Sequence, residues 1–458
     1  MKVKGAGDDG VKPQLLPATS YPEIRLRFLL RKSPTQSQRE SLRMAEQVSF
    51  VPMEAVGENG GINLDVIRNK EDVSTGYTLF FDGDVVVAKI TPCFENCKGA
   101  MVSGLHGGVG FGTTELHVLS AAERLDAGFL FYLTISHSFR IQGEAAMKGA
   151  AGQKRVSDEF IQDFRFRLPS LAEQRQIKCY LDAETAQMDA LMVEKERMLA
   201  LLEEKRAALV SHAVTRGLNA RAKLKPSGLR WLGDIPAHWE MKRLKFLISG
   251  LTQGWSPQAS NVPATESEVG VLKLSAVSKG QFIPDENKAL MPDEEYPAEL
   301  AIKRGDLLVS RSNTPGLVGD ACAVPADFPN LLIPDLIYRL RVHTEVADSE
   351  YLAAFLLTPI ARTQIRGDAR GSSGTMVKVG QEHIQNWRIP VPPLAEQRAI
   401  VAMIAEERGR TAVFREALER SIALLKERRS ALITAAVTGQ ITVPGGGKPT
   451  KHETTHEN

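Results

Sequence analysis

The sequence has few cysteines and no long apolar run, and each of these absences excludes a class of protein. Four of its 458 residues are cysteine, and no second Cys/His pair at zinc-ligand spacing accompanies Cys93 and Cys97. We therefore expect reduced thiols in the cytoplasm, without a disulfide framework or a metal site. No run of about 18 apolar residues occurs, and no charged-then-apolar leader follows Met1. The sequence accordingly predicts neither a membrane protein nor an exported one.

A strong net charge and catalytic motifs are also lacking. Lys and Arg number 57 against 55 Asp and Glu, a formal net charge of +2, so contact with nucleic acid has to come from local basic patches. There is no Gly-x-x-x-x-Gly-Lys-Ser/Thr phosphate loop and no Asn/Asp-Pro-Pro-aromatic motif of an amino-methyltransferase. The glycine-rich segment 107–112 lacks the flanking strand and helix of a dinucleotide loop and indicates a turn-rich hairpin. We therefore predict no catalytic residues and no metal ligands.

The chain contains one long segment twice. Residues 171–215 and 394–438 align without a gap, and 19 of the 45 paired positions are identical. Both copies begin Leu-Ala-Glu-Gln-Arg and end Ala-Val-Thr. Chance does not preserve register over that length, so the chain is a tandem duplication.

Each copy has the apolar periodicity of a single long helix. A capping box of Ser170 and Glu173 precedes the first copy, and Gly217 and Gly439 lie just past the two ends. About 43 residues at 1.5 Å each give a rod of roughly 64 Å, which cannot bury its apolar stripe alone. Because a chain that returns to its start must reverse direction, we predict an antiparallel coiled coil. Its predicted apolar residues are Ile177, Leu181, Met188, Leu191, Met198, Leu202, Leu209, Ile400, Ile404, Phe414, Leu418, Leu425 and Leu432.

The segments that precede the two helices are related more weakly. Gly83-Asp84 and Gly305-Asp306 each precede an apolar run, and both predict a turn that enters a buried strand. Short β-branched runs, turns and a few helices, such as those expected at 129–138 and 350–362, are typical of an α+β domain. We thus predict an α+β protein with two tandem related globular domains, separated by two long helices, and a pseudo-twofold arrangement. The predicted segments are a flexible leader (1–20), a first domain (21–168), a first long helix (169–217), a linker (218–228), a second domain (229–391), a second long helix (392–440) and a disordered tail (441–458).

Basic residues gather in the glycine-rich segment before each long helix and after each Gly-Asp turn. Glycine and serine let the backbone approach a phosphate closely, while Arg and Lys supply charge and bidentate contacts to guanine. A solvated loop without a ligand has the same composition, but the matched position of the two segments favours a role in binding. The candidate DNA-binding residues are Lys89, Lys148, Lys154, Arg155, Arg311, Arg366, Arg370 and Lys378.

Several motifs in this order resemble the specificity subunits of type I DNA restriction–modification systems, over about residues 21–440. The first domain has only Tyr21-Pro22-Glu23 in place of the longer segment that introduces the second domain. The motifs are Leu-Pro-Ser-Leu-Ala-Glu-Gln-Arg (168–175), Val-Pro-Pro-Leu-Ala-Glu-Gln-Arg (391–398), Trp-Leu-Gly-Asp-Ile-Pro-Ala-His-Trp-Glu (231–240) and Gly-Phe-Gly-Thr-Thr-Glu-Leu-His-Val-Leu (110–119).

The resemblance implies a non-catalytic subunit with two target-recognition domains, each of which reads half of a bipartite, asymmetric site in double-stranded DNA. The paired helices set the number of unread base pairs and dock two modification subunits, which methylate adenine. The resemblance places no cofactor on this chain: S-adenosylmethionine, ATP and magnesium belong to the modification subunits and to restriction (motor-nuclease) subunits. The alternative is a protein-interaction scaffold that does not read DNA, and a stand-alone nuclease is the least expected function.

Overall fold

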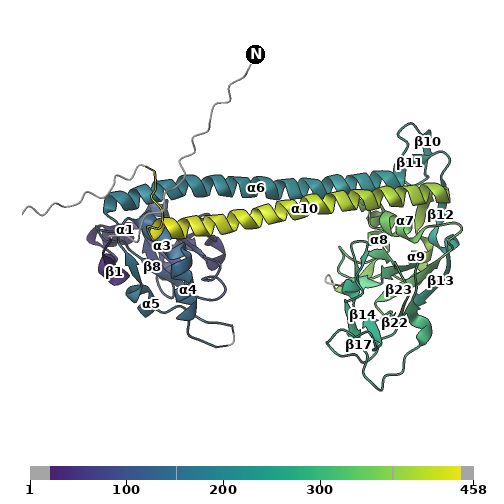
Figure 1. Ribbon diagram of the computed structural model, residues 1–458, viewed down its shortest axis with the longest axis horizontal. Helices are drawn as coiled ribbons and strands as arrows, with labels where there is room; N and C mark the ends of the chain where they lie inside the picture. Colours follow the sequence, from purple (N-terminus) through teal and green to yellow (C-terminus); the bar gives the residue numbers. More distant parts are fainter. Residues whose placement is uncertain (1–20, 151, 374–375, 445–458) are drawn as a thin grey trace, which may run out of the picture. The chain divides into compact units, whose positions relative to one another are not determined.

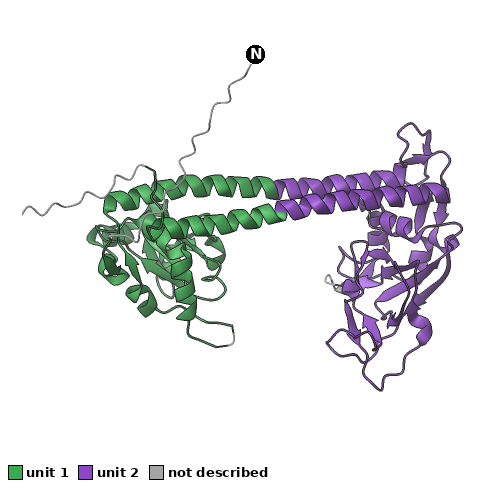
Figure 2. Ribbon diagram, in the orientation of Figure 1, with its two compact units in different colours: residues 1–195, 419–458 green, residues 196–418 purple. Residues whose placement is uncertain are grey.

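The computed structural model describes residues 21–150, 152–373 and 376–444 (Figure 1). Contacts divide the chain into two compact units (Figure 2). The first comprises the residues up to Lys195 and from Glu419 onward, and the second comprises Glu196–Leu418. Each unit therefore combines one globular block with part of both long helices. Among the described residues, no helix is both long and apolar enough to span a membrane.

The globular block of the first unit is built on two sheets. One has the strand order β3-β2-β7-β4, in which β2 and β7 are parallel, and the other has the order β6-β5-β8. A short antiparallel pair of β1 and β9 joins the beginning and end of the block. The strands are β1 (Glu23–Arg25), β2 (Gln47–Val51), β3 (Ile67–Asn69), β4 (Thr78–Phe81), β5 (Val85–Ala88), β6 (Gly99–Met101), β7 (Val109–Gly112), β8 (Leu116–Leu119) and β9 (Arg165–Arg167). The helices are α1 (Gln36–Met44), α2 (Lys70–Val73), α3 (Ala127–Ile135), α4 (His137–Ala145) and α5 (Asp158–Asp163).

The second unit repeats this plan with additional strands. The sheet β17-β14-β22-β18 again has a central parallel pair, β14 with β22, and the sheet β13-β23-β19-β21 corresponds to β6-β5-β8. The strands are β10 (Leu224–Pro226), β11 (Asp234–Pro236), β12 (Glu240–Arg243), β13 (Ile248–Gln253), β14 (Gly270–Leu272), β15 (Val277–Ser278), β16 (Gln281–Phe282), β17 (Asn287–Ala289), β18 (Ala301–Ile302), β19 (Asp306–Ser310), β20 (Ser312–Asn313), β21 (Ala321–Ala323), β22 (Phe328–Leu332), β23 (Ile337–Val342), β24 (Arg370–Ser373), β25 (Met376–Lys378) and β26 (Arg388–Val391). The helices are α7 (Ser349–Leu356), α8 (Pro359–Asp368) and α9 (Gln381–Asn386).

The two Gly-Asp turns precede buried strands, as predicted. Gly83 and Gly305 adopt φ of 87° and 84°, which a side chain would disfavour, and every residue of β5 and β19 is buried. Asp84 closes its turn by accepting a hydrogen bond from the Phe81 amide at 2.9 Å, and Asp306 closes the other through the Lys303 amide at 2.8 Å. Burial raises the pKa of both carboxyls. The same turn thus starts the central strand of each block.

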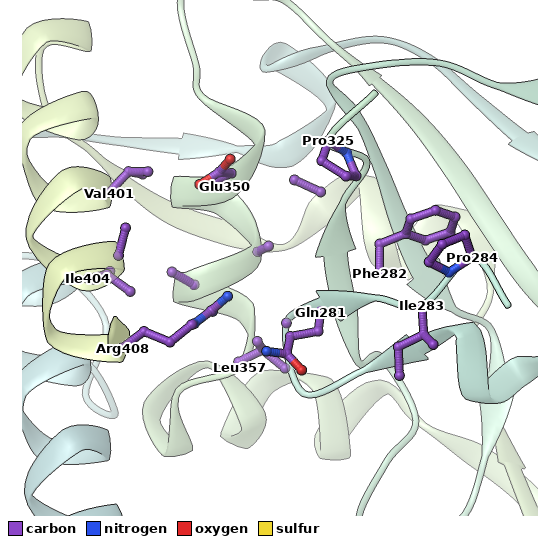
Figure 3. Close-up of a pocket in the computed structure, with 15 residues that line it drawn as sticks. Gln281, Phe282, Ile283, Pro284, Pro325, Glu350, Leu357, Val401, Ile404 and Arg408 are labelled. Atoms are coloured by element: carbon purple, nitrogen blue, oxygen red, sulfur yellow. The ribbon is translucent and has the colours of Figure 1, made fainter. Parts of the chain in front are cut away.

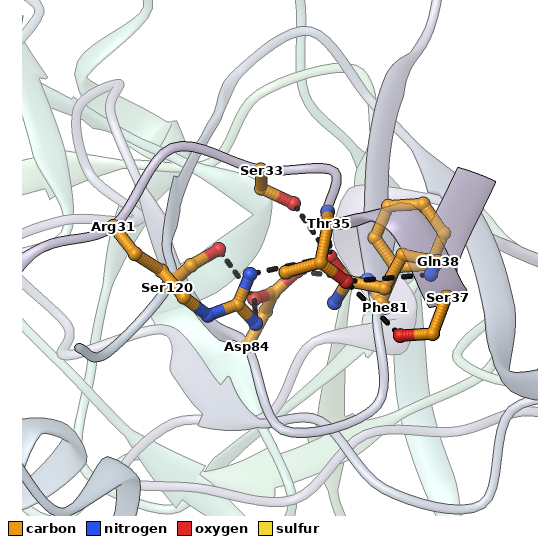
Figure 4. A network of polar contacts seen from close by, with 8 residues as sticks. All are labelled: Arg31, Ser33, Thr35, Ser37, Gln38, Phe81, Asp84 and Ser120. Atoms are coloured by element: carbon orange, nitrogen blue, oxygen red, sulfur yellow. Dashed lines mark hydrogen bonds and ion pairs between the residues drawn. The ribbon is translucent and has the colours of Figure 1, made fainter. Parts of the chain in front are cut away.

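A polar network surrounds the first of these turns (Figure 4). The Ser120 hydroxyl donates to the buried Asp84 carboxylate at 2.5 Å, and the Arg31 guanidinium lies 3.8 Å from the same oxygen. Arg31 also donates to Gln38, which forms a capping box with Thr35 at the start of α1. The buried turn is therefore linked through Arg31 to the first helix of the block.

Two long helices are present, as the repeat predicts: α6 (Leu171–Arg216) and α10 (Leu394–Val437). They run antiparallel within each unit. In the first unit Asp189 of α6 pairs with Arg429 of α10 at 3.2 Å, while Ile177, closer to the start of α6, shares a core with Val437. In the second unit Glu203 forms an ion pair with Arg415. The buried residues of this pairing include Ile177, Leu181, Met188, Ile400, Ile404, Ile422 and Ile433.

The predicted apolar seam is wrong in its central part. The side chains of Leu191, Met198 and Phe414 are 52%, 47% and 64% exposed, so they do not pack between the helices. An α-helix drifts by about 20° per heptad relative to a strict seven-residue repeat, which turns these positions outward. The half-buried members of the predicted seam are Leu202, Leu209, Leu418, Leu425 and Leu432.

Several predicted boundaries are also wrong. The helices expected at 129–138 and 350–362 are each divided in two, because the backbone is extended at Ser136 and Thr358, the N-cap residues of α4 and α8; the Thr358 side chain also accepts from the Ala361 amide. The predicted linker contains β10, which pairs with β11. Val443 is buried in the core of the first unit, so the disordered tail cannot begin at residue 441. The predicted leader, and the tail from residue 445, lie outside the described residues.

A buried glutamine fastens each long helix to its block. The side-chain amide of Gln174 donates to the carbonyls of Arg124 and Pro169 at 3.0 and 2.9 Å and accepts from the Asp126 amide at 2.8 Å. Asp126 is itself the N-cap of α3. The side chain of Gln174 is fully buried, so each of these bonds replaces a contact with water that the fold excludes.

The second unit repeats the same hydrogen bonds. Gln397 donates to the carbonyls of Val346 and Pro392 at 3.0 and 2.9 Å and accepts from the amide of Asp348, the N-cap of α7, at 2.9 Å.

The glutamate that precedes each glutamine binds the residues that introduce the block. Glu173 accepts from the Tyr21 hydroxyl at 2.9 Å, and Glu396 accepts from the Trp239 indole at 3.1 Å. Tyr21 therefore takes the place of the longer introducing segment.

Replacement of Gln174 by leucine should destabilise the first unit. The leucine fills a similar volume but leaves the Asp126 amide and two carbonyls without partners, and we expect a loss of about 3 kcal/mol in the free energy of unfolding. Urea denaturation of the full chain measures this loss. Gln142→Leu, at an exposed position of α4, is the matched control and should change the free energy by less than about 0.5 kcal/mol. Equal stability of the two variants would contradict the fastening role.

Candidate nucleic-acid interface

In the first unit, four of the predicted basic residues come together on one hairpin and the strand end beside it. Lys148 and Arg155 face each other in an antiparallel bridge, with hydrogen bonds of 3.0 and 2.9 Å between their backbones. Thr91, in the turn that follows β5, binds the far end of this hairpin. Its hydroxyl donates to the Gly152 carbonyl at 2.6 Å, and its amide donates to the Lys154 carbonyl at 3.0 Å. We call residues 148–155 the first basic hairpin; residue 151 lies outside the described residues. The side chains of Lys148, Lys154 and Arg155 are exposed on it.

The second unit carries a corresponding hairpin, formed by β24 and β25. Arg370 pairs with Lys378 across this second basic hairpin, residues 370–378, and Lys378 also pairs with Ser312 of β20. Residues 374 and 375 of this hairpin lie outside the described residues. The predicted Arg366 is not on the hairpin but in the last turn of α8, where it is exposed.

Both hairpins are anchored by the same backbone hydrogen bond. The amide of Val156 donates to the carbonyl of Lys89 at 2.9 Å, and the amide of Val379 donates to the carbonyl of Arg311 at 3.0 Å. Lys89 and Arg311 directly follow the buried strands β5 and β19. The structure therefore brings Lys89 together with the first basic hairpin, and Arg311 with the second, at equivalent places of the two blocks.

Some of these basic side chains are already partly neutralised. Arg155 donates from Nε to both carboxylate oxygens of Glu115, at 3.1 and 2.9 Å, and from Nη2 at 2.8 Å, and this contact lowers the pKa of the Glu115 carboxyl. Arg311 lies 3.9 Å from the carboxylate of Asp335 and donates to its backbone carbonyl at 3.2 Å. The Arg370 guanidinium donates to the carbonyl of Gly367 at 2.5 Å. Lys148, Lys154 and Lys378 keep an exposed ammonium group, so they are the cations most available to a phosphate.

Each unit also has a buried arginine, not predicted from the sequence, that binds the loop beside its hairpin: Arg140 in the first unit and Arg362 in the second. Arg140 of α4 donates to the Phe94 carbonyl at 2.8 Å and lies over the Phe94 ring at 4.4 Å. Arg362 of α8 donates to the carbonyls of Val318 and Gly316 and forms an ion pair with Asp320 at 3.6 Å. Burial lowers the pKa of Arg140 to about 10 and also lowers the pKa of Arg362.

The two arginines share a position that the sequence does record. Each stands four residues after the N-cap of its helix, Ser136 or Thr358. Burial cannot be read from this spacing, since an arginine on a short amphipathic helix is usually exposed. Among the described residues, no group of three or more His, Cys, Asp or Glu side chains is placed to hold a metal ion. The arrangement offers cations, amides and hydroxyls for binding.

No protein-family model matches this chain. The specificity subunit of the type I restriction enzyme EcoEI from Escherichia coli is 28% identical, over 79% of this chain and 73% of that protein. A chain from a structure of assembly and conformational transition in the type I R-M system has a TM-score of 0.69 at 18% identity, covering 93% of this chain and 99% of that one.

A second solved structure, the HsdS subunit from Thermoanaerobacter tengcongensis, has a TM-score of 0.51 at 20% identity and covers 94% of this chain and 99% of that one. The sequence likeness and the fold likeness thus point to one family. The resemblance predicted from the repeated motifs is confirmed: in sequence and in fold, this chain is similar to the specificity subunits of type I restriction–modification systems.

Proposed function

We propose that the chain is the DNA-recognition subunit of a type I restriction–modification complex. The two basic hairpins carry this proposal, because each combines exposed Lys or Arg side chains with the same anchor to a buried strand, β5 or β19. A rigid anchor lowers the entropy cost of holding cations against phosphates. The two specificity subunits to which the chain is similar support the same conclusion.

We further propose that each block reads one half of a bipartite site. Residues 21–168 and 229–391 are the two target-recognition domains, and the long helices within 169–217 and 392–440 set their separation. The blocks share both sheets and the buried Gly-Asp turn, yet the connecting loops differ in length and sequence. A shared fold with different loops is suited to two domains that recognise different base sequences.

The exposed apolar residues on the long helices are the proposed docking surface for two modification subunits. In the second unit Val413 and Phe414 are 69% and 64% exposed, and in the first unit Val193 and Leu424 are 64% and 58% exposed. Apolar residues at such exposure are typical of a surface that a partner covers. S-adenosylmethionine, ATP and magnesium are assigned to the modification and restriction subunits, and this chain has no catalytic role.

The first prediction concerns the basic hairpins. Charge reversal of Lys148, Lys154 and Lys378 to glutamate should weaken DNA binding by the complex with the modification subunit and lower the salt dependence by about one counterion per lysine. Gel shifts at several salt concentrations measure both effects. Lys426→Glu, an exposed lysine of α10 away from the hairpins, is the control. Unchanged binding of the triple variant would favour a protein-interaction scaffold that does not contact DNA.

The second prediction concerns docking. Phe414→Asp places a charge among the exposed apolar residues of the second unit and should reduce the amount of modification subunit that co-purifies, without lowering the thermal stability of the isolated chain. Ser430→Asp, at an exposed polar position of the same helix, should leave assembly intact. If both variants assembled equally well, Phe414 would lie outside the interface.

The third prediction concerns spacing. Insertion of seven residues into α6 near Lys195 and of seven into α10 near Glu419 should lengthen the helix pair by about 10 Å, or about three base pairs. Sequencing of methylated adenines should then show the same half-sites with a longer spacer between them. Altered half-sites with an unchanged spacer would rule out the spacing role of the helices.

A further inference from the structure

The second unit contains a cavity with an unusually basic wall, lined by residues of α6, α8 and α10. Its volume is about 380 Å³. Five basic side chains and one acidic side chain line it: Arg206, Lys279, Arg362, Arg366, Arg408 and Asp320. We call it the cationic cavity. The DNA-recognition function uses only Arg366 of this set, so the remaining charges call for another explanation.

Two of the five cations are balanced within the protein. Arg362 pairs with Asp320 at 3.6 Å, and Arg206 pairs with Glu203 at 3.2 Å. Among the described residues, Lys279, Arg366 and Arg408 form no ion pair, although the Asp320 carboxylate accepts a hydrogen bond from the Lys279 backbone; all three side chains are exposed. Like charges gathered on one wall repel each other, and this repulsion is relieved when an anion binds between them.

The internal repeat shows that the helix pair does not require these charges. Arg408 of α10 corresponds to Thr185 of α6, which donates to the Leu181 carbonyl at 2.7 Å. Arg206 corresponds to Arg429, but Arg429 is neutralised by Asp189 at 3.2 Å, whereas alanine stands at the position equivalent to Asp189 in the second copy. The first unit therefore packs the equivalent helix segments with Thr185 and with Arg429, which is paired with Asp189. The excess positive charge is specific to the second unit.

A second cavity of about 380 Å³ adjoins the cationic one; its wall is mainly apolar but also includes Glu350 and Gln281. The two share Ala354, Leu357, Ile404 and Arg408 in their walls. Figure 3 shows Arg408 extending from α10 toward Gln281, with Phe282 and Pro284 on the side opposite α10. A flat apolar group and an anionic group can thus be held on the two sides of Arg408.

We propose that the two cavities together bind a phosphate-bearing small molecule of nucleotide type. Its phosphates contact Lys279, Arg366 and Arg408, because guanidinium groups bind phosphate oxygens in pairs and the lysine ammonium adds a point charge. Its ring lies in the apolar cavity near Phe282, with the Gln281 amide as a hydrogen-bonding partner. Duplex DNA presents phosphates with its bases paired inside, so it would leave the apolar cavity empty. This site on the chain is separate from the DNA-binding hairpins and from the cofactor sites assigned to the partner subunits.

Calorimetric titration of the full chain with ATP, tripolyphosphate and adenosine tests the proposal. We expect ATP to bind more tightly than either fragment. Arg408→Thr, which introduces the residue of the first copy, and Lys279→Ala should each weaken ATP and tripolyphosphate binding by about tenfold. Phe282→Leu should weaken ATP binding but leave tripolyphosphate binding unchanged.

Arg410→Thr is the matched control, because Arg410 pairs with Glu407 at 2.9 Å on the same helix and lines neither cavity. It should bind ATP as the unaltered chain does. Absence of ATP binding, or equal binding by the Arg408→Thr variant, would overturn the proposal. A third outcome would also overturn it: the unaltered chain does not bind ATP, and the Arg408→Thr variant loses binding to DNA or to the modification subunit. The cavity would then be a contact for that partner. The gel shifts of the hairpin variants test DNA recognition separately.

Discussion

The hydrogen bonds of a buried glutamine amide are the interaction on which both units depend. Gln174 and Gln397 are fully buried, and each joins the first turn of a long helix to the N-cap residue of α3 or α7. An amide with both ends bonded fixes the helix in direction and in rotation, since a shift would leave buried polar groups unpaired. The faces of the helices that meet each other, and the faces that remain exposed, follow from this attachment.

The same fixed body carries different surfaces in the two units. The parallel pair of strands, the buried Gly-Asp turn and the buried arginine of α4 or α8 recur. Around them the contacts differ: Arg362 has Asp320 as a partner, whereas Nε and Nη2 of Arg140 have no hydrogen-bond partner among the described residues. Duplication followed by such local change is a direct route to two related sites with different ligands, because the packed core tolerates few changes while exposed loops tolerate many.

The repeat was sufficient to predict the long helices, because identity in register and apolar periodicity both survive in the sequence. It was not sufficient to predict which apolar residues pack between them. Phe414 fits a heptad pattern but is exposed, while Ile433 lies outside that pattern and is buried. Periodicity gives the direction of a side chain from its own helix, but burial depends on what stands opposite. The candidate basic residues were likewise found by sequence, whereas their pairing into two hairpins depends on hydrogen bonds to distant strands.

The sequence by itself determined the duplication, the α+β class, the two long helices and the positions of the exposed lysines. These properties are local or repeated, so they can be read along the chain. Only the tertiary structure decided that Gln174 and Gln397 hold the helices, that Arg140 and Arg362 are buried, and that Arg408 stands beside Lys279 and Arg366. These contacts join residues far apart in sequence, and their energies depend on burial and on partner atoms, which no single segment of sequence contains.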